Sequence, residues 1–411
     1  TLLYEHDAAG QLIRRVNGAG PILDLIRDQR GLIVEQRLRE REDAEPESVT
    51  FAYDRAGDLT EARSRDCELF FARDAVRRVV AASADGVTVS SAFDAAGRRL
   101  ARTTAHGHLS LWSYDQAGRP ATLSAGDRQF SFGHDAAGRE AFRWIGADLA
   151  ITSEWDALGR LSSRRVVGVQ GPAEARTSTM LQEHAWTYRP DGAVQSSADT
   201  VGGARGFELD LFGRVTAVRA AGWSETYAYD SAGNLTNAAD TRTADAPASG
   251  PRQLDGTLLR QAGRTSYEYD AQGRLVAVVR RTLSGQRKQW TYSYDAQDRM
   301  TQALLPDGQT WRYRYDPLGR RIAKQRLAQD GEPVEEIRFV WDGELLAEEH
   351  RSAADTAVVT VTSWDYEPGT WTPIAQRRHT FHRDTPQETI DEQFHAIVAD
   401  LVGTPQQLVT A

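Results

Sequence analysis

The stretches FDAAGR (93–98), YDQAGR (114–119), HDAAGR (134–139) and WDALGR (155–160) are copies of one short motif. A ring-bearing residue precedes Asp, two residues separate Asp from Gly, and Arg follows Gly. The spacing from one Asp to the next is 21, 20 and 21 residues. A fixed period of this size indicates a stacked array, in which no unit can bury its apolar face alone. We therefore predict a repeat protein.

The motif also occurs outside this stretch. Further copies, not all with the Arg, read HDAAG (6–10), YDRAG (53–57), YDSAG (229–233), YDAQGR (269–274) and YDPLGR (315–320). Weaker copies are RDQRG (27–31), LDLFGR (209–214), the FARD segment that ends at Asp74, and YDAQDR, in which Asp298 replaces the Gly. We assign turns to the Asp and Gly of nine copies, namely Asp54, Gly57, Asp94, Gly97, Asp115, Gly118, Asp135, Gly138, Asp156, Gly159, Asp210, Gly213, Asp230, Gly233, Asp270, Gly273, Asp316 and Gly319.

The chemistry of Asp-x-x-Gly is that of a type I turn. Asp at the first position accepts a hydrogen bond from the backbone two residues on, and Gly at the last position allows a positive φ. Pro317 has the φ that the second position requires. Asp298 would have to adopt the left-handed conformation, which Asp tolerates moderately well. Residues 316–319 (DPLG) are one more turn, because they follow Asp295 by 21 residues, in register with the repeat.

The segments that flank the turns alternate as strands do. In KQWTYSYD (288–295) and QTWRYRYD (309–316), aromatic and polar residues alternate, so the rings share one face. One unit is therefore a strand, a tight turn and a return strand, and the expected fold class is all-β. Two interpretations of the aromatic rows stay open. They fill the contact between stacked hairpins, which we favour, or they form a platform on which sugars stack.

Arg follows the Gly in most copies of the motif. A guanidinium can lie on an aromatic ring and pair with a carboxylate, so these arginines can form ladders with rings and Asp side chains of neighbouring units. A row of sites for anions or sugars is the alternative, which the uniform spacing disfavours. The residues concerned are Arg98, Arg119, Arg139, Arg160, Arg214, Arg274 and Arg320.

Composition limits the classes of protein. The chain has 34 Gly, 14 Pro and 40% hydrophobic residues, which suits a large core. Its formal net charge of −9 argues against nucleic acid or an anionic membrane as the main partner. No apolar run is long enough to span a membrane, and no signal-peptide pattern opens the chain. The single Cys67 excludes an intramolecular disulfide. Because the chain starts and stops inside the pattern, we expect a fragment of a longer protein.

Two segments interrupt the period. Residues 166–184 (VVGVQGPAEARTSTMLQEH) are interpreted as an inserted loop, after which YRPDG (188–192) is a degenerate copy of the motif. Residues 236–262 include a polar, turn-rich stretch where one copy is missing between Asp230 and Asp270. Loops of this size in a repeat array usually project from one face or line an opening.

Signs of catalysis are few. The sequence contains no GxxxxGK[ST], GxSxG or HExxH motif, and the repeated Asp residues are committed to turns. His106-Gly-His108 would lie on one face of a strand and supply half of a metal site, and His379-x-x-His382 is similar, but neither pair has an obvious third ligand. We therefore expect surface histidines, no metal, no cofactor and no catalytic residue.

The repeats and four further motifs resemble the RHS (rearrangement hotspot) or YD-repeat family. The motifs follow one another, as in the RHS-associated core region of bacterial polymorphic toxins, in the order YRYDPLGRRIAKQ (313–325), FVWDGELLAEE (339–349), WDYEPGTWTPIAQ (364–376) and HAIVADLVGTPQQLVTA (395–411). Before Gly-Thr-Pro this chain departs from the usual His-Leu, with Leu401 and Val402. The residues that carry the core-region motifs are Trp341, Asp342, Gly343, Tyr366, Pro368, Gly369, Asp400, Gly403, Thr404 and Pro405.

The resemblance implies a ribbon of β-hairpins that spirals into a hollow, cocoon-like shell around a C-terminal toxin domain of the same polypeptide. It implies that residues 1–312 form the shell wall and that 313–411 form the core region that plugs one end. The chain then ends before the segment whose aspartates cut the polypeptide and release the toxin. Such proteins are made in the bacterial cytoplasm and then secreted or injected, many by type VI secretion, with secretion-machinery spike or chaperone proteins as partners.

Two functions are compatible with this interpretation. One is a non-enzymatic container, the shell of an RHS toxin, with neither nucleic acid nor a membrane as its partner. The other is an extracellular module for adhesion that binds carbohydrate through its aromatic and Arg rows. The lack of disulfides and the core-region motifs favour the container. An autonomous hydrolase would need a site that the sequence does not reveal.

Overall fold

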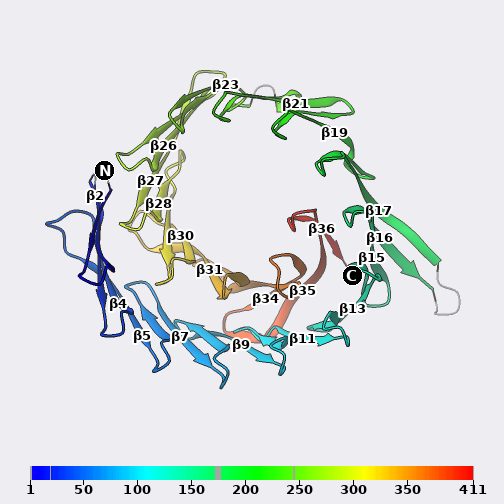
Figure 1. Cartoon of the computed structure of the whole chain (residues 1–411), viewed down its shortest axis with the longest axis horizontal. Helices are drawn as coiled ribbons and strands as arrows, with labels where there is room; N and C mark the ends of the chain where they lie inside the picture. Colours follow the sequence, from blue (N-terminus) through cyan, green and yellow to red (C-terminus); the bar gives the residue numbers. More distant parts are fainter. Residues whose placement is uncertain (1, 19, 172–176, 244–245, 411) are drawn as a thin grey trace.

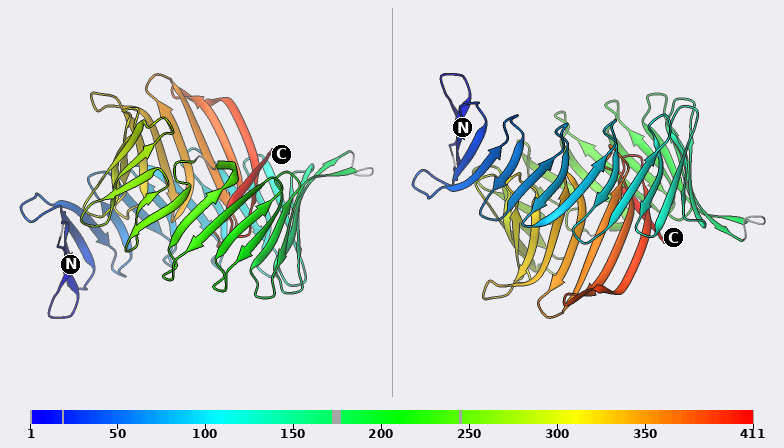
Figure 2. Two further views of the ribbon diagram at one scale, coloured as in Figure 1. Left: turned by 90° about the horizontal axis from the view of Figure 1, so that it is seen from above. Right: turned by 90° about the horizontal axis from the view of Figure 1, so that it is seen from below.

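A continuous antiparallel sheet curves into a ring and then continues inside its own beginning. The computed structural model describes residues 2–18, 20–171, 177–243 and 246–410. Figure 1 looks down the axis of the ring, and Figure 2 shows the same ribbon from above and from below. Each strand pairs antiparallel with its neighbours in the chain, so the sheet is a meander of hairpins. The expected all-β ribbon that spirals into a hollow shell is confirmed.

The strands follow one another around the ring in chain order. The first part, blue to cyan in Figure 1, consists of β1 (Leu2–His6), β2 (Leu12–Asn17), β3 (Ile22–Arg27), β4 (Ile33–Arg39), β5 (Glu47–Tyr53), β6 (Leu59–Arg63), β7 (Glu68–Arg73), β8 (Val79–Ala84), β9 (Val87–Phe93), β10 (Arg99–Thr103), β11 (Leu109–Tyr114), β12 (Pro120–Ala125), β13 (Arg128–His134), β14 (Glu140–Ile145) and β15 (Leu149–Trp155). The part that closes the ring consists of β16 (Leu161–Gln170), β17 (Thr177–Tyr188), β18 (Val194–Asp199), β19 (Gly203–Leu209), β20 (Val215–Ala220), β21 (Trp223–Tyr229), β22 (Leu235–Asp240), β23 (Gly250–Asp255), β24 (Leu258–Ala262), β25 (Thr265–Tyr269), β26 (Leu275–Arg281), β27 (Arg287–Tyr294), β28 (Met300–Leu304) and β29 (Thr310–Tyr315). The last part, yellow to red in Figure 1, consists of β30 (Arg321–Leu327), β31 (Pro333–Asp342), β32 (Leu345–Ala353), β33 (Val358–Tyr366), β34 (Pro373–His382), β35 (Thr385–Ala399) and β36 (Pro405–Thr410). A 3-10 turn, η1 (Thr241–Thr243), is the helical element in the described part of the chain.

The repeated motif forms one kind of hydrogen-bonded turn. In all nine copies assigned above, the Gly N–H donates to the Asp carbonyl, and the Gly has a positive φ. In YDQAGR, Oδ1 of Asp115 also accepts from the N–H of Ala117 at 2.9 Å, and Gly118 has a φ of 80°. Where Gly is replaced, Asp298 and Arg77 adopt the left-handed conformation, with φ of 64° and 72°. The turn geometry therefore tolerates the exchange of its Gly, at a cost in backbone strain.

The arginines after the turns link neighbouring hairpins. Nε of Arg98 donates to Oδ2 of Asp94 at 2.6 Å, and its guanidinium lies 4.9 Å from the ring centre of Tyr114, just before the next Asp. The same stack recurs as Arg139 on Trp155, Arg160 on Tyr188, Arg214 on Tyr229, Arg274 on Tyr294 and Arg299 on Tyr315. The expected stacking of these arginines on rings of neighbouring units is confirmed, but the repeated Asp that pairs with each Arg belongs to the same turn and not to a neighbouring unit. Each stack contributes about 0.5–1 kcal/mol where it is exposed and more where water is excluded.

The ring before the Asp has a second contact that the sequence pattern did not reveal. The hydroxyl of Tyr114 donates at 2.9 Å to the carbonyl of Arg99, on the strand that follows the previous turn. Equivalent bonds run from Tyr188 to Leu161, from Tyr229 to Val215, from Tyr294 to Leu275, and from the indole N–H of Trp155 to Glu140. The polar end of each ring thereby fixes the register of one hairpin against the previous one.

The ribbon completes a turn and packs its last strands against its first ones. Hydrogen bonds across this overlap join residues 235 positions apart, from Arg164 to Ala399, and 263 apart, from Arg102 to Asp365. We call the zone in which β30–β36 lie against β6–β16 the seam. A buried apolar layer fills much of it, with Trp112, Leu123, Phe130, Ile145, Ile151, Val166, Ile374 and Phe394. Burial of each large apolar side chain contributes about 1.5–3 kcal/mol, so the seam is a core between two layers of one sheet.

The prediction that residues 166–184 form an inserted loop is wrong. Strand β16 continues to Gln170 and β17 begins at Thr177, so most of the segment forms a long hairpin that projects from the ring (Figure 1). Residues 172–176 lie outside the described residues. The strand continues because Val166 and Val169 are buried, at 2% and 6% exposure. The degenerate YRPDG does form a turn, in which the N–H of Gly192 donates to the carbonyl of Arg189 at 3.0 Å.

The segment 236–262 keeps the sheet continuous without a copy of the motif. Strand β22 ends at Asp240, η1 follows, and β23 and β24 form a hairpin before the next regular unit. Residues 244–245 lie outside the described residues. Pairing of β22 with β23 and of β24 with β25 is limited to two positions each, so the ladder of hydrogen bonds is shortest in this part of the sheet.

Gly118→Val tests the turn. The change puts a β-branched residue at a φ of 80°, with its Cβ 3.3 Å from Nη1 of Arg98. We expect destabilisation by about 1–3 kcal/mol, measured as a lower midpoint of thermal unfolding. Gly206→Val is the control, because Gly206 lacks a positive φ and has open space at its Cβ position. Equal melting temperatures for Gly118→Val and the wild type would show that the turn assignment is wrong.

Candidate functional site at the seam

The seam brings together buried charged residues from distant parts of the sequence. On one side lies the hairpin of β10 and β11 with its turn at 104–108, and on the other lie β32 and β33. The exposed fractions are 3% for Arg102, 2% for His108, 0% for Glu348 and 3% for Asp365. Buried charges are unfavourable unless they are paired. Their partners therefore determine what the seam can do.

Asp365 accepts three hydrogen bonds from the opposite hairpin. Nη2 of Arg102 donates to Oδ1 at 2.9 Å, Nε2 of His108 lies 2.8 Å from Oδ2, and the hydroxyl of Ser110 also donates to Oδ1. Burial alone would raise the pKa of Asp365, but the charge of Arg102 and the bonds from His108 and Ser110 lower it below its ordinary value. Asp365 is therefore a buried carboxylate that is held in its charged form.

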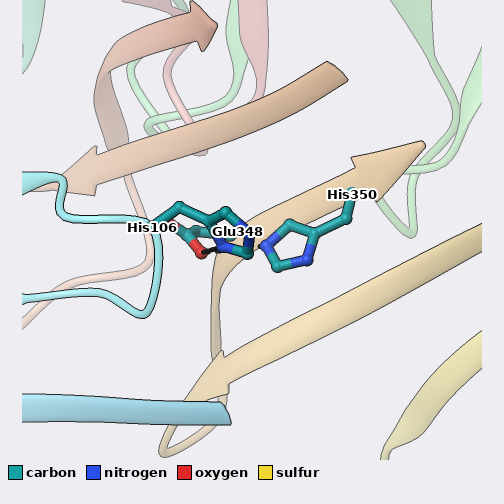
Figure 3. Close-up of side chains that lie close together, drawn as sticks. All are labelled: His106, Glu348 and His350. Carbon is teal, nitrogen blue, oxygen red and sulfur yellow. Dashed lines mark hydrogen bonds and ion pairs between the residues drawn. The ribbon is translucent and has the colours of Figure 1, made fainter. Parts of the chain in front are cut away.

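Glu348 lies between two histidines and two hydroxyls. Its Oε2 is 3.4 Å from Nδ1 of His106 and 2.9 Å from Nε2 of His350, and Figure 3 shows these side chains converging. Its Oε1 accepts a bond from the hydroxyl of Thr104 and another, at 3.2 Å, from Ser363. Burial alone would raise the pKa of Glu348, but the bonds from His106, His350 and Thr104 lower it well below its usual range. The potential ligand atoms of His106, Glu348 and His350 all lie within 4.8 Å of one another.

A cavity of about 640 Å³ adjoins the Asp365 cluster. Its lining comes from both sides of the seam and includes Trp112, Trp371 and Glu367. Both Nη atoms of Arg99 bind Asp342 in its wall, at 2.5 and 2.9 Å. Burial, helped by a neighbouring carboxylate, raises the pKa of Glu367. The cavity is thus bounded by rings, a paired cation and a carboxyl group whose pKa is raised by burial.

The core-region motif at 339–349 lies on this side of the seam. The indole N–H of Trp341 donates at 2.8 Å to the carbonyl of Arg321. Asp342 is the partner of Arg99, and the carbonyl of Gly343 accepts a bond from Arg320 at 2.6 Å. This motif therefore joins the last strands of the ribbon both to the preceding turn and to the first strands.

The motif at 364–376 adds to the same region. The hydroxyl of Tyr366 donates at 3.0 Å to the carbonyl of Leu346. Pro368 and Gly369 lie in the turn between β33 and β34, and both line the cavity. Gly369 has a φ of 76°, as the Gly of an ordinary repeat turn does. The motif is therefore a modified repeat unit whose turn faces the seam.

The last motif forms a separate turn between β35 and β36. Oδ1 of Asp400 accepts bonds from the N–H groups of Val402 and Thr404, at 2.9 and 2.8 Å, as in the repeat turns. Gly403 has a φ of 85°, and a Cβ there would lie 2.7 Å from Oγ1 of Thr372. Pro405 begins β36 and pairs with the last residue of β35. These residues lie apart from the cavity and the Glu348 cluster.

The Asp and Gly residues of the nine repeat turns do not gather at one place. They follow one another along the ribbon, and each Asp bonds within its own turn. For Asp115, the N–H and then the guanidinium of Arg119 lower the pKa of the carboxyl. These carboxylates are occupied as acceptors in their turns.

The two histidine pairs considered as half-sites do not act as pairs. His106 and His108 do not share a strand face, because the turn at Gly107, with a φ of 78°, sends them to different carboxylates. His379 lies 2.8 Å from the hydroxyl of Thr389, and His382 is exposed. The sequence pattern therefore identified His106 but not its partners.

Glu348, His350 and Asp365 escaped the sequence analysis. They stand in LLAEEH (345–350) and WDY (364–366), where charged residues interrupt short apolar or aromatic runs. That interruption was the available signal, since charged residues are rarely buried unless they are paired. It indicates a buried partner but does not reveal which one.

Comparison with known proteins identifies two family models in the chain. The model of the RHS repeat matches residues 210–245, and the model of the teneurin YD-shell matches residues 258–335. The structure described as TcdB2-TccC3 without its hypervariable C-terminal region matches all of this chain and 23% of its own, with a TM-score of 0.72 and 15% identity. The structure of the Photorhabdus luminescens Tc holotoxin pore matches with a TM-score of 0.64 and 16% identity. This match covers 100% of the present chain and 23% of the chain in that structure. At such identities these structures show the fold alone.

Relatives among curated proteins are bacterial toxins and nucleases. The chain is 31% identical over 317 residues to Probable deoxyribonuclease RhsA of Dickeya dadantii. This alignment covers 73% of the present chain and 20% of RhsA. It is 27% identical over 392 residues to Toxin protein Tse5 of Pseudomonas aeruginosa, and this alignment covers 86% of the present chain and 28% of Tse5. The chain thus spans between a fifth and a third of these relatives. No helix in the described part of the chain is long and apolar enough to cross a membrane.

Asp365→Asn tests the charged part of the seam. The amide keeps the shape of the side chain but leaves Arg102 buried without its carboxylate. Removal of one partner from a buried ion pair costs about 3–5 kcal/mol, so we expect a clearly lower melting temperature at pH 7. Glu208→Gln is the matched control, because its ion pair with Arg219 is exposed on both sides and should contribute little.

The charge of Asp365 also predicts that the thermal stability of the protein depends on pH. The folded-state pKa of Asp365 lies below its unfolded value, so its contribution is present above the unfolded pKa and is lost as pH falls through the folded one. We expect the melting temperature of the wild type to fall more between pH 7 and pH 3 than that of Asp365→Asn. An equal fall in both would mean that Asp365 contributes no pH-linked stability.

Proposed function

We propose that this chain, which belongs to the RHS and YD-repeat family, is the wall of a container that encloses a C-terminal toxin domain of the same polypeptide. The observation that carries this proposal is the closed wall. The ribbon completes a turn around an open centre (Figure 1), and a buried apolar layer and two ion pairs, one buried and one part-buried, hold its last strands against its first. The relatives add support, since RhsA and RhsB are named as probable deoxyribonucleases and Tse5 as a toxin, while this chain covers 20%, 22% and 28% of them.

A wall of this kind suits a cargo that is not fully folded. In a meander, each strand between the first and the last has a hydrogen-bonded neighbour on both sides. Free strand edges pair readily with other exposed strands and cause aggregation. The two rims of the ribbon consist of turns, so the wall offers an enclosed polypeptide few edges to join. The shell thus isolates a toxin without catalysing anything itself.

The remaining parts of the proposal concern organisation and delivery. Residues 1–312 serve as the wall, and 313–411 as the core region near one end of the shell. An aspartyl-type segment beyond the last residue of this chain cuts the polypeptide and frees the toxin. The protein is made in the bacterial cytoplasm and is injected into a competitor cell by a type VI secretion machine, with spike or chaperone proteins as partners.

The carbohydrate-binding alternative has less support. Cations already cover the rings of the aromatic rows, with Arg280 at 5.0 Å from the ring of Trp290 and Arg321 at 4.6 Å from that of Tyr313. A sugar would have to displace these cations before it could stack on the rings. The aromatic rows therefore act as links between hairpins.

The full-length protein, purified under native conditions, tests the container. We expect a C-terminal fragment that is cut after the shell, co-elutes with it on gel filtration, and separates only on a denaturing gel, where intact mass gives the cut site. The fragment should resist added protease until the shell is unfolded. A single uncut chain whose C-terminal domain is digested at once would contradict enclosure, and glycan binding would then be examined.

A further inference from the structure

We propose that His106, Glu348 and His350 bind a divalent transition-metal ion of the Zn²⁺ type, which clamps the two turns of the shell together. Two imidazole nitrogens and one carboxylate oxygen are a donor set that suits Zn²⁺, with a fourth position left for water. Alkaline-earth ions prefer sites made of oxygen ligands alone. The proposal does not depend on what the shell encloses.

The geometry of the three side chains fits such an ion. Nδ1 of His106 and Nε2 of His350 both face Oε2 of Glu348, at 3.4 and 2.9 Å. Zinc bonds of about 2.0–2.2 Å in a tetrahedron place neighbouring ligand atoms roughly 3.3 Å apart. The imidazole rings approach edge to face, with centres 4.1 Å apart and planes at 74° (Figure 3). Small side-chain shifts are therefore enough to admit the ion.

The two oxygens of Glu348 have separate partners. Oε1 is held by the hydroxyls of Thr104 and Ser363, which leaves Oε2 to the histidines. Hydrogen bonds of this kind orient metal-ligating carboxylates in known sites. The carboxylate is thus fixed with one oxygen aimed between the two imidazole rings.

The charge at this place also indicates a cation. Of the other carboxylates of the seam, the part-buried Asp342 pairs with Arg99 and the buried Asp365 with Arg102. Glu348 has 0% exposure, yet among the described residues its ion-pair partners are the histidines alone. A buried carboxylate without a permanent cation is unfavourable. A divalent ion would supply the charge that Arg supplies to its two neighbours.

The ligands come from opposite sides of the overlap. His106 belongs to the turn between β10 and β11, whereas Glu348 and His350 lie on β32, 242 positions further along the chain from His106 to Glu348. His106 is 34% exposed in its side chain, so an ion can enter from solvent without unfolding the seam. A bound ion would therefore link the first turn of the spiral to the second.

Zn²⁺ titration of the full-length protein, freed of metal by a chelator, tests the site. Isothermal titration calorimetry should show one tight ion per chain, and Co²⁺ used as a probe should give the visible absorption of a four-coordinate site. His106→Ala and His350→Ala should abolish this binding. Thr104→Ala, which removes a supporting bond to Glu348 and a bond from the N–H of His108 within the turn, should weaken it about 10- to 100-fold.

His382→Ala is the matched control, because His382 is an exposed histidine on β34 and is not among the three proposed ligands. It should bind Zn²⁺ as the wild type does. If the wild type binds no Zn²⁺, or if His106→Ala and His350→Ala bind it as well as His382→Ala does, the proposal is wrong. His106 is exposed in a turn, so its variant should fold even if the variant of the less exposed His350 does not.

A thermal measurement separates a clamp from adventitious binding. An ion that binds only the closed seam raises the melting temperature with its concentration. We expect Zn²⁺ to raise the melting temperature of the wild type and of His382→Ala, and to leave that of His106→Ala unchanged. Binding without any such rise would contradict the role as a clamp.

Discussion

The carboxylate of the repeated Asp is the constraint on which the wall depends. It closes its own turn through Oδ1 and, in the units where Arg follows the Gly, holds that Arg through Oδ2, as Asp94 does with Arg98. That guanidinium lies on the ring of Tyr114 in the next unit, whose hydroxyl is bonded back to Arg99. Neighbouring hairpins are thus joined at the turn edge, whatever their two faces bury. This allows strands with small side chains, such as VVAASA at 79–84, to take part in a stable wall.

The closure of the wall rests on different interactions. The apolar layer around Phe130 and Phe394 supplies the favourable free energy of burial. Buried ion pairs add little net stability, because desolvation offsets their attraction. They do demand one geometry, so the pairs of Arg99 with Asp342 and of Arg102 with Asp365 define where the second turn meets the first. Apolar burial thus stabilises the seam, and the paired charges specify its register.

The proposed container and the proposed clamp would place function at two different levels of the structure. Enclosure is a property of the whole ribbon and needs no special residue, since it follows from continuous pairing and from closure. The cluster around Glu348 is local, and it stands where closure occurs. A metal ion there would make the stability of the closed wall depend on metal concentration, as for any ligand that binds the folded state alone.

What the sequence by itself determined is what lies within about one repeat of the chain. The turns, the Arg ladder and the all-β class were predictable, because their partners stand at most a few tens of residues apart and recur with the period. The continuation of the strand past Val166 was not, since that side chain is buried by the returning last strands. Only the tertiary structure decided the seam. Its pairs are separated by 235 to 263 residues, as from Arg164 to Ala399 and from Arg102 to Asp365, and no local pattern encodes which charge meets which after a full turn of the spiral.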